Sequence, residues 1–208
     1  MSNNDESTMS DNYQMKCGVT LGILAAVMAA NSIVGGRWGA EEIKSAGEKG
    51  TAYAWYQSKS IKESIIEGNR DNVKALLDTP NAKNEYRVNL HKNLDKLNKT
   101  LDRYDKEKKE ILEGSEGVGK DNWVLKHKGE LGKIKGALEW EKSLKLYEDA
   151  GDIFDLSAMF LQISLVLGSI SLLLKRASIR NAFYNMMVGI GLVGSYYLNQ
   201  AIIFVGGV

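Results

Sequence analysis

Cysteine, proline and histidine are nearly absent from this chain of 208 residues. Its single cysteine, Cys17, excludes an intramolecular disulfide, and Pro80 is the only proline that can interrupt a helix. The two histidines, His91 and His127, have no cysteine or carboxylate cluster with metal-ligand spacing around them, so we expect no metal site and no cofactor. With 27 Lys and Arg against 26 Asp and Glu, the charge is balanced, and no surface for nucleic acid is expected.

Charge is also missing from three long segments, in which Asp155 is the only charged residue. A helix of about 20 uncharged residues matches a hydrocarbon thickness of about 30 Å, so each segment predicts a membrane span. The expected order is a polar N-terminal tail at 1–16, a first span at 17–36, a charged helical hairpin at 37–152, a second span at 153–174, a basic turn at 175–182 and a third span at 183–208. We expect residues 1–12 to be disordered or frayed.

Nearly all charges fall within 37–152, a composition typical of exposed helices. The predicted fold is therefore all-α, with three transmembrane helices and a long, coiled-coil-like extramembrane hairpin. We expect an outgoing helix at 37–67 that stops at Gly68-Asn69, and a turn at Asp78-Thr79-Pro80. The returning path would contain a second helix, a break at glycines within 114–119, and a third helix from about Asn122 with Leu131, Ile134 and Leu138 on one face.

A heptad pattern is the clearest periodicity in the hairpin. Its members are Leu90, Leu94, Leu97, Leu101 and Tyr104, at alternating spacings of four and three. Lys108 and Ile111 continue the spacing and place one lysine at a core position. The pattern predicts a hairpin seam that packs against another helix, within the chain or across subunits.

Two sets of residues in the spans predict contacts between helices. Gly18, Gly22, Ala26 and Ala30 recur every fourth residue and predict a face for close helix packing, against this chain or another. An intramembrane polar layer would contain Asn31, Gln162, Tyr196, Tyr197, Asn199 and Gln200. Polar groups in hydrocarbon need partners, so this layer is expected to hold helices together. The alternative is the lining of a water-filled path.

The segment 114–120, Gly-Ser-Glu-Gly-Val-Gly-Lys, has the spacing of a phosphate-binding loop. Asp121 follows where a Ser or Thr should hold magnesium, and the preceding sequence is a charged helix rather than a buried strand. We therefore interpret the segment as a chance match and expect no nucleotide site.

One segment of the outgoing helix carries a family resemblance. The residues Trp55, Tyr56, Gln57, Lys59, Lys62 and Glu63, with the later basic pair Lys175-Arg176, resemble the bacterial membrane-protein family of domain of unknown function 4337. The resemblance implies a three-span protein with a long helical hairpin and no assigned activity. From the residues alone, the aromatic rings and lysine stems of this motif are expected to pack within the hairpin or to dock another subunit.

These observations predict a non-enzymatic integral membrane protein that self-associates in the lipid bilayer as a scaffold or interaction module. The alternative is a pore or channel formed by the oligomer. Lys175, Arg176 and Arg180 lie in a short connection without an acid, which favours a cytoplasmic location. The family resemblance implies the bacterial inner membrane, and the basic connection predicts that the N-terminus is in the cytoplasm and the hairpin outside.

Overall fold

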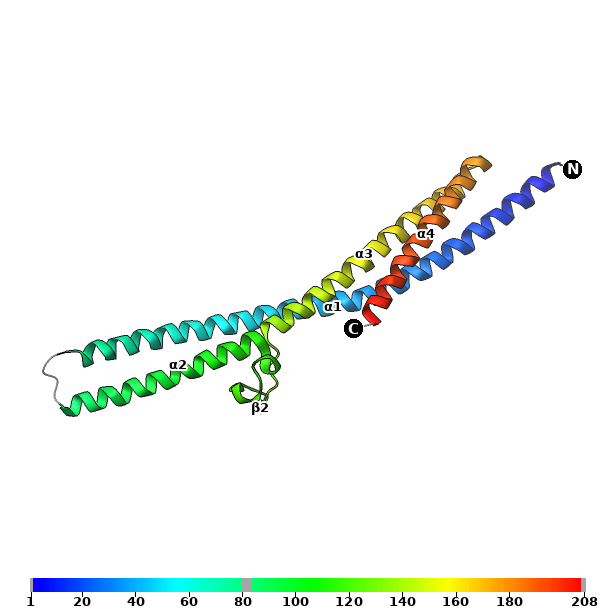
Figure 1. Ribbon diagram of the computed structural model, residues 1–208. Helices are drawn as coiled ribbons and strands as arrows, with labels where there is room; N and C mark the ends of the chain where they lie inside the picture. The colour runs from blue at the N-terminus through cyan, green and yellow to red at the C-terminus, as the bar shows by residue number, and fades with distance from the viewer. Residues whose placement is uncertain (1, 80–83, 207–208) are drawn as a thin grey trace. The chain divides into compact units, whose positions relative to one another are not determined.

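The protein is almost entirely helical in the computed structural model, which describes residues 2–79 and 84–206, with side chains from Asn12 onward. The elements, drawn in Figure 1, are α1 (Ser2–Leu77), α2 (Asn84–Val118), η1 (Lys120–Asn122), β1 (Lys126–His127), β2 (Glu130–Leu131), α3 (Ala137–Leu173) and α4 (Ala177–Gly206). The predicted all-α fold is confirmed. The chain forms two compact units, which we call the three-helix unit (Met1–Glu42 with Lys145–Val208) and the hairpin unit (Ile43–Leu144).

Three helices in the described part of the chain are long and apolar enough to cross a membrane: α1, α3 and α4. This confirms the expectation of three membrane-length helices. Their starts differ from the expected domain limits, because α1 already begins at Ser2 and α4 at Ala177. The chain is helical from Ser2, where we expected residues 1–12 to be disordered or frayed, and the connection before α4 is only 174–176, so Arg180 lies inside α4.

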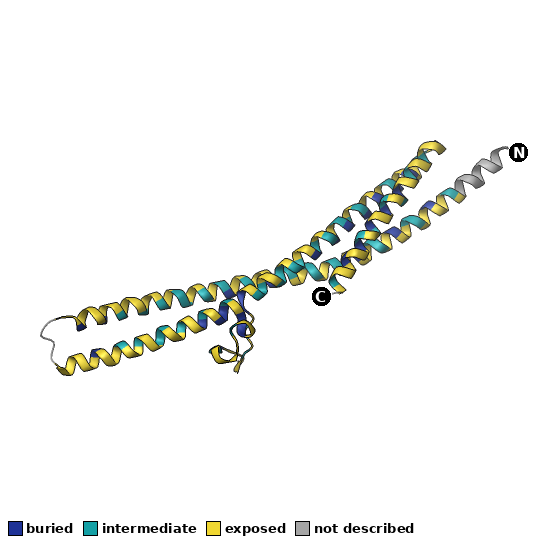
Figure 2. Ribbon diagram, in the orientation of Figure 1, coloured by how far each residue is buried: buried dark blue, intermediate teal, exposed yellow. Residues whose placement is uncertain are grey.

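Heptad spacing organises the interior of the three-helix unit. Buried positions recur at spacings of four and three along α3 and along α4 (Figure 2). They are Ala150, Phe154, Ser157, Leu161, Ser164, Gly168 and Ser171 on α3, and Met187, Gly191, Gly194, Leu198 and Ala201 on α4. Cys17 and Leu24 of α1 complete a core with Leu161 and Met187. Most of these residues are small, which lets the helix backbones approach closely.

Three serines of α3 bind the antiparallel α4 at intervals of seven residues. The hydroxyl of Ser157 donates to the Gly194 carbonyl at 2.9 Å, and that of Ser164 donates to the Met187 carbonyl at 2.7 Å. Ser171 donates to the Arg180 carbonyl at 3.3 Å. All three side chains are fully buried, so each hydroxyl needs such a partner. We call this set the serine ladder.

In the hairpin unit, α1 and α2 run antiparallel and pack through a continuous seam. Val73 and Leu77 of α1 form a cluster with Leu90 of α2. The expected helix stop at Gly68-Asn69 is therefore wrong: α1 continues to Leu77 because its inner face still has α2 to pack against, and this contact outweighs the helix-breaking tendency of glycine. Asp78 and Thr79 begin the turn, whereas Pro80 lies outside the described residues.

The segment between α2 and α3 departs most from the sequence prediction. The expected glycine break occurs at Gly114, whose φ of 84° is non-helical, and at Gly119. The expected helix from about Asn122 is wrong, because residues 119–136 instead form η1 and the short β1–β2 hairpin, and α3 begins only at Ala137. We call residues 119–136 the insert. Leu131 lies in β2, so its expected helical stripe with Ile134 and Leu138 does not exist.

Close packing of α4 predicts an asymmetry between two of its glycines. A Cβ on Gly194 would lie 2.8 Å from Leu161 Cγ, whereas a Cβ on Gly189 meets no described atom within 4 Å. Gly194→Ile should therefore lower the free energy of unfolding by about 1–3 kcal/mol through overpacking. Gly189→Ile, the matched control, should have little effect. Denaturation of both variants in detergent measures this, and equal stabilities would contradict the packing of α4 on α3.

Candidate functional site

The segment 114–120, which resembles a phosphate-binding loop, follows the helical part of α2 rather than a strand. Its first two residues are buried. Gly114 and Ser115 are buried at the end of α2, where Ser115 donates a hydrogen bond to the Glu110 carboxylate at 2.7 Å. In a phosphate-binding loop the glycine-rich segment follows a buried strand, whereas here it ends a charged helix. His91 and His127 are both exposed, and the described residues contain no group of side chains suited to hold a metal.

A buried carboxylate organises the insert. Glu110 is fully buried, and its Oε2 accepts hydrogen bonds from the backbone amides of Val124 at 2.9 Å and Leu125 at 2.8 Å. Ser115 Oγ in turn accepts the Ile134 amide at 3.0 Å. The indole of Trp123 donates to the Ser115 carbonyl at 2.5 Å. A buried charge satisfied by several donors is stable, so Glu110 fixes the insert on α2. The sequence pattern did not single out this residue.

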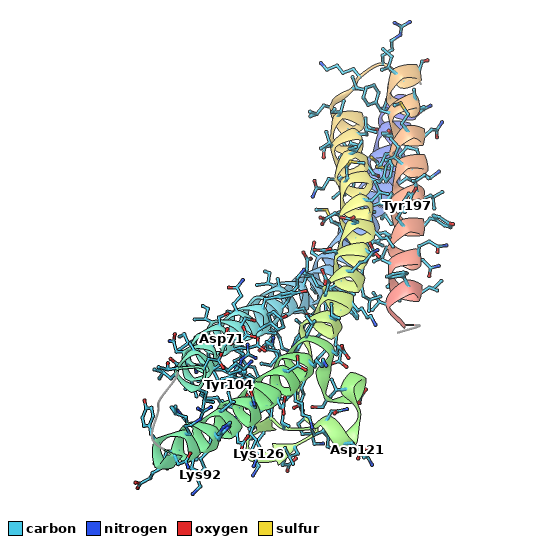
Figure 3. The ribbon with its side chains drawn as sticks, turned by 60° about the vertical axis from the view of Figure 1, so that its left-hand side comes forward. Asp71, Lys92, Tyr104, Asp121, Lys126 and Tyr197 are labelled. Atoms are coloured by element: carbon cyan, nitrogen blue, oxygen red, sulfur yellow. The ribbon has the colours of Figure 1, made fainter. Side chains whose placement is uncertain are left out.

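The predicted hairpin seam lies on the α1-facing side of α2. Leu94 and Leu97 pack on the cluster of Val73, Leu77 and Leu90. Leu101 and Tyr104 are half-buried further along the same face, and Figure 3 locates Tyr104 in this unit. The Tyr104 ring also receives two cations, Lys59 Nζ at 5.5 Å and the Arg103 guanidinium at 5.3 Å from its centroid.

Ion pairs replace leucines where the seam approaches the insert. Lys59 of α1 pairs with Glu107 of α2 at 2.5 Å, and Lys108 of α2 pairs with Glu63 of α1. These side chains are only 10–19% exposed. The hydrogen bond to Glu63 raises the pKa of Lys108 above its ordinary value of 10.5, although partial burial opposes the shift. The lysine that interrupts the sequence pattern is therefore paired across the hairpin.

The family-like motif is divided between two environments. Tyr56, Lys59 and Glu63 are half-buried in the seam, whereas Gln57 and Lys62 are exposed. Trp55 is 36% exposed and lines a groove of about 400 Å³ in the hairpin unit. Its other lining residues are Glu48, Thr51, Ala52, His127, Lys133, Ile134, Lys135 and Trp140.

The small-residue face of α1 is exposed in the described part of the chain. Gly18, Gly22, Ala26 and Ala30 are all exposed, and a Cβ on either glycine meets no described atom within 4 Å. The packed side of this part of α1 is the opposite one, with Cys17, Leu24 and Asn31. The predicted contact therefore still lacks a partner in the described part of the chain.

The six residues of the predicted polar layer do not form one network. Asn31 is buried and donates to the Phe154 carbonyl at 3.2 Å, while its Oδ1 has no hydrogen-bond partner in the described part of the chain. Gln200 donates to the Tyr196 hydroxyl at 3.0 Å. Tyr197 contacts the Tyr196 ring edge and stacks on Phe160. Gln162 and Asn199 are exposed, as are Tyr196 and Gln200.

The serine ladder was missed by the sequence prediction. Its signal was the seven-residue recurrence of Ser157, Ser164 and Ser171 inside an apolar segment. Serine is common in apolar helices, and the recurrence is informative only once α4 is known to present carbonyl oxygens at the same intervals.

Comparison with known proteins gives a match to a protein family. A protein-family model described as "Domain of unknown function (DUF4337)" matches residues 13–203. No curated protein and no solved structure matches the chain.

The ion pairs predict that the stability of the hairpin depends on opposite charges facing each other across α1 and α2, whichever helix carries the lysine and whichever carries the glutamate. Lys108→Glu places a like charge against Glu63 and should cost about 1–3 kcal/mol of stability, as expected for an unpaired buried charge. The double exchange Lys108→Glu with Glu63→Lys should recover most of the loss. Lys109→Glu is the matched control, because Lys109 pairs only at the surface. Helix content during denaturation of the full-length protein reports all three; a double variant no better than the single would refute the pairing.

The pH dependence has a defined sign. Because the pKa of Lys108 is raised in the folded protein, the stabilisation from its pair with Glu63 is complete below 10.5 and disappears as the pH rises through the folded value.

Proposed function

Because the chain belongs to the family of domain of unknown function 4337, whose description names no activity, we propose a function from its geometry: a non-enzymatic, homo-oligomeric scaffold of the membrane. In this proposal α1, α3 and α4 cross the bilayer, copies associate through α1, and the hairpin unit is presented outside the lipid. The proposal rests on the exposed small-residue face of α1.

That face has the composition of a helix contact in lipid. Lipid chains are as apolar as leucine, so helices associate by close packing, for which glycine and alanine at intervals of four are suited. Gly18, Gly22, Ala26 and Ala30 offer such a face, and no described residue of the chain covers the two glycines. A second copy supplies a helix of the right length and chemistry.

Exposed amides support the same conclusion. Gln162 lies well within the apolar segment of α3 and is exposed in the described part of the chain, as is Asn199 of α4. An amide that faces hydrocarbon without a hydrogen-bond partner costs several kcal/mol. Association of copies gives these side chains partners.

The same exposed polar residues support a second candidate, a pore. If Gln162 of α3 and the exposed polar residues of α4 face a common axis rather than a protein interface, the oligomer has a water-filled path. The two candidates differ in ion flux through liposomes that contain the purified protein: a pore conducts, whereas a scaffold leaves the membrane sealed.

Association through α1 predicts the effect of enlarging one glycine. Gly22→Leu should reduce the mass of the intact complex in lipid nanodiscs, because overpacking a close contact costs about 1–3 kcal/mol. Gly189→Leu on α4 is the matched control, since its Cβ position is equally open within the chain. Unchanged mass for Gly22→Leu would mean that this face points to lipid.

We further propose the bacterial inner membrane, with the N-terminus and the 174–176 connection in the cytoplasm. The basic residues Lys175, Arg176 and Arg180 motivate this orientation. In a Cys17→Ala background, Asp121→Cys, at an exposed position in the insert (Figure 3), should react with an impermeant thiol reagent in intact spheroplasts. Lys175→Cys should react only after lysis. The reverse pattern would invert the topology.

A further inference from the structure

Within the hairpin unit, α1 has a second face that α2 does not cover. Every member is exposed, and the spacing alternates between four and three. The members are Ile43, Gly47, Gly50, Ala54, Gln57, Ile61, Ser64 and Gly68. We call this set the outer face. It lies opposite the inner seam, whose half-buried members include Tyr56, Lys59 and Glu63.

The outer face is free of charge in a segment that is otherwise densely charged. None of its eight residues carries a charge, although α1 has lysines and glutamates at most turns between Ile43 and Gly68. The large apolar side chains along it are strongly exposed: Ile43 is 76% exposed, Ile61 63% and the adjacent Ile65 58%. The outer face is thus uncharged along its length and carries large exposed apolar side chains at Ile43 and Ile61, and exposed apolar side chains that gather on one face mark interaction surfaces.

Packing among the described residues does not account for the glycines of the outer face. A Cβ on Gly47, Gly50 or Gly68 would meet no described atom within 4 Å, and none of them has a positive φ. Each glycine in a helix interior costs about 1 kcal/mol relative to alanine. Close approach of another backbone is the physical use that glycine serves at such positions.

We propose that the outer face of α1 packs in parallel against the outer face of α1 in a second copy of this chain, outside the membrane. This rests on the proposed self-association, which anchors copies in one membrane with their α1 helices pointing the same way. In a parallel pair related by symmetry, each residue meets its own equivalent, so any charge on the face would meet a like charge. A face without charges avoids this repulsion. A partner of different sequence could instead carry opposite charges, so it would not require an uncharged face.

The size of the contact agrees with an anchored pair. The face covers about 26 residues, or about 39 Å of helix at a width of about 10 Å, which is on the order of 400 Å² per copy. Stable complexes of free proteins bury about 800 Å² per partner. The outer face therefore pairs only when anchoring raises the effective concentration of the hairpins.

Disulfide trapping in the full-length protein tests this pairing. In a Cys17→Ala background, Gly47→Cys and Ala54→Cys place a thiol on the outer face, and Lys62→Cys places one on the exposed side of the same helix away from it. Mild oxidation of native membranes should give covalent dimers for the first two and few for the third. Complex mass in nanodiscs is measured for the same samples.

A charge on the face should abolish trapping. Ile61→Glu, added to Gly47→Cys, should lower the dimer yield about tenfold, because like charges are then opposed across the contact. Val88→Glu is the matched control, since Val88 on α2 is 64% exposed against 63% for Ile61.

The outcomes separate this inference from the proposed function. An oligomer that persists without trapping at Gly47 and Ala54 overturns the outer-face pairing and leaves the scaffold intact. Trapping with equal yield at Lys62, or equal effects of Ile61→Glu and Val88→Glu, shows random collision and also overturns it. A monomer in nanodiscs overturns both.

Discussion

A seven-residue recurrence on α1 is the constraint on which the structure depends. Buried or half-buried positions return at Cys17, Leu24, Asn31, Trp38, Ser45, Ala52, Lys59, Ile66 and Val73. A helix can bury every seventh residue over such a length only if it packs against helices with the same period of 3.5 residues per turn. In α2, α3 and α4 the buried or half-buried positions likewise alternate at spacings of four and three. The spacing of buried positions is therefore constant over the described length of α1, whereas the type of residue at these positions varies.

The chemistry changes between the two units. In the three-helix unit, small residues and buried serine hydroxyls fill the seam, which suits an environment where close packing and hydrogen bonds are the available attractions. In the hairpin unit, leucines occupy one end and the pairs Lys59–Glu107 and Lys108–Glu63 occupy the other. Half-buried ion pairs add little net stability, but a shift of register would leave each charge alone, so they select one alignment of α1 and α2.

The sequence was informative where hydrophobicity marks the structure. The three membrane-length helices were predictable from uncharged segments, and the leucines of α2 from their spacing. The seam of α1 could not be predicted, because charged or polar residues such as Ser45, Lys59 and Glu63 occupy its core positions, so no hydrophobic periodicity is visible there. The helix end expected at Gly68 was wrong because packing against α2, rather than local helix propensity, continues α1 to Leu77. The insert depends on Glu110, whose hydrogen bonds to distant backbone amides leave no local pattern.

The last residues of the insert lie against α2, a few residues before the point where the insert begins. The Ser115 amide donates a hydrogen bond to the Ile134 carbonyl at 2.9 Å, and a Cβ on Gly114 would lie 3.0 Å from the Gly136 amide nitrogen. The chain thus leaves α2 and returns to the start of α3 through a closed loop. Because loop length changes closure entropy only slowly, residues at its exposed β1–β2 tip can be added or deleted without disturbing the helical register. The length and sequence of this tip are therefore independent of the spacing that the helices require.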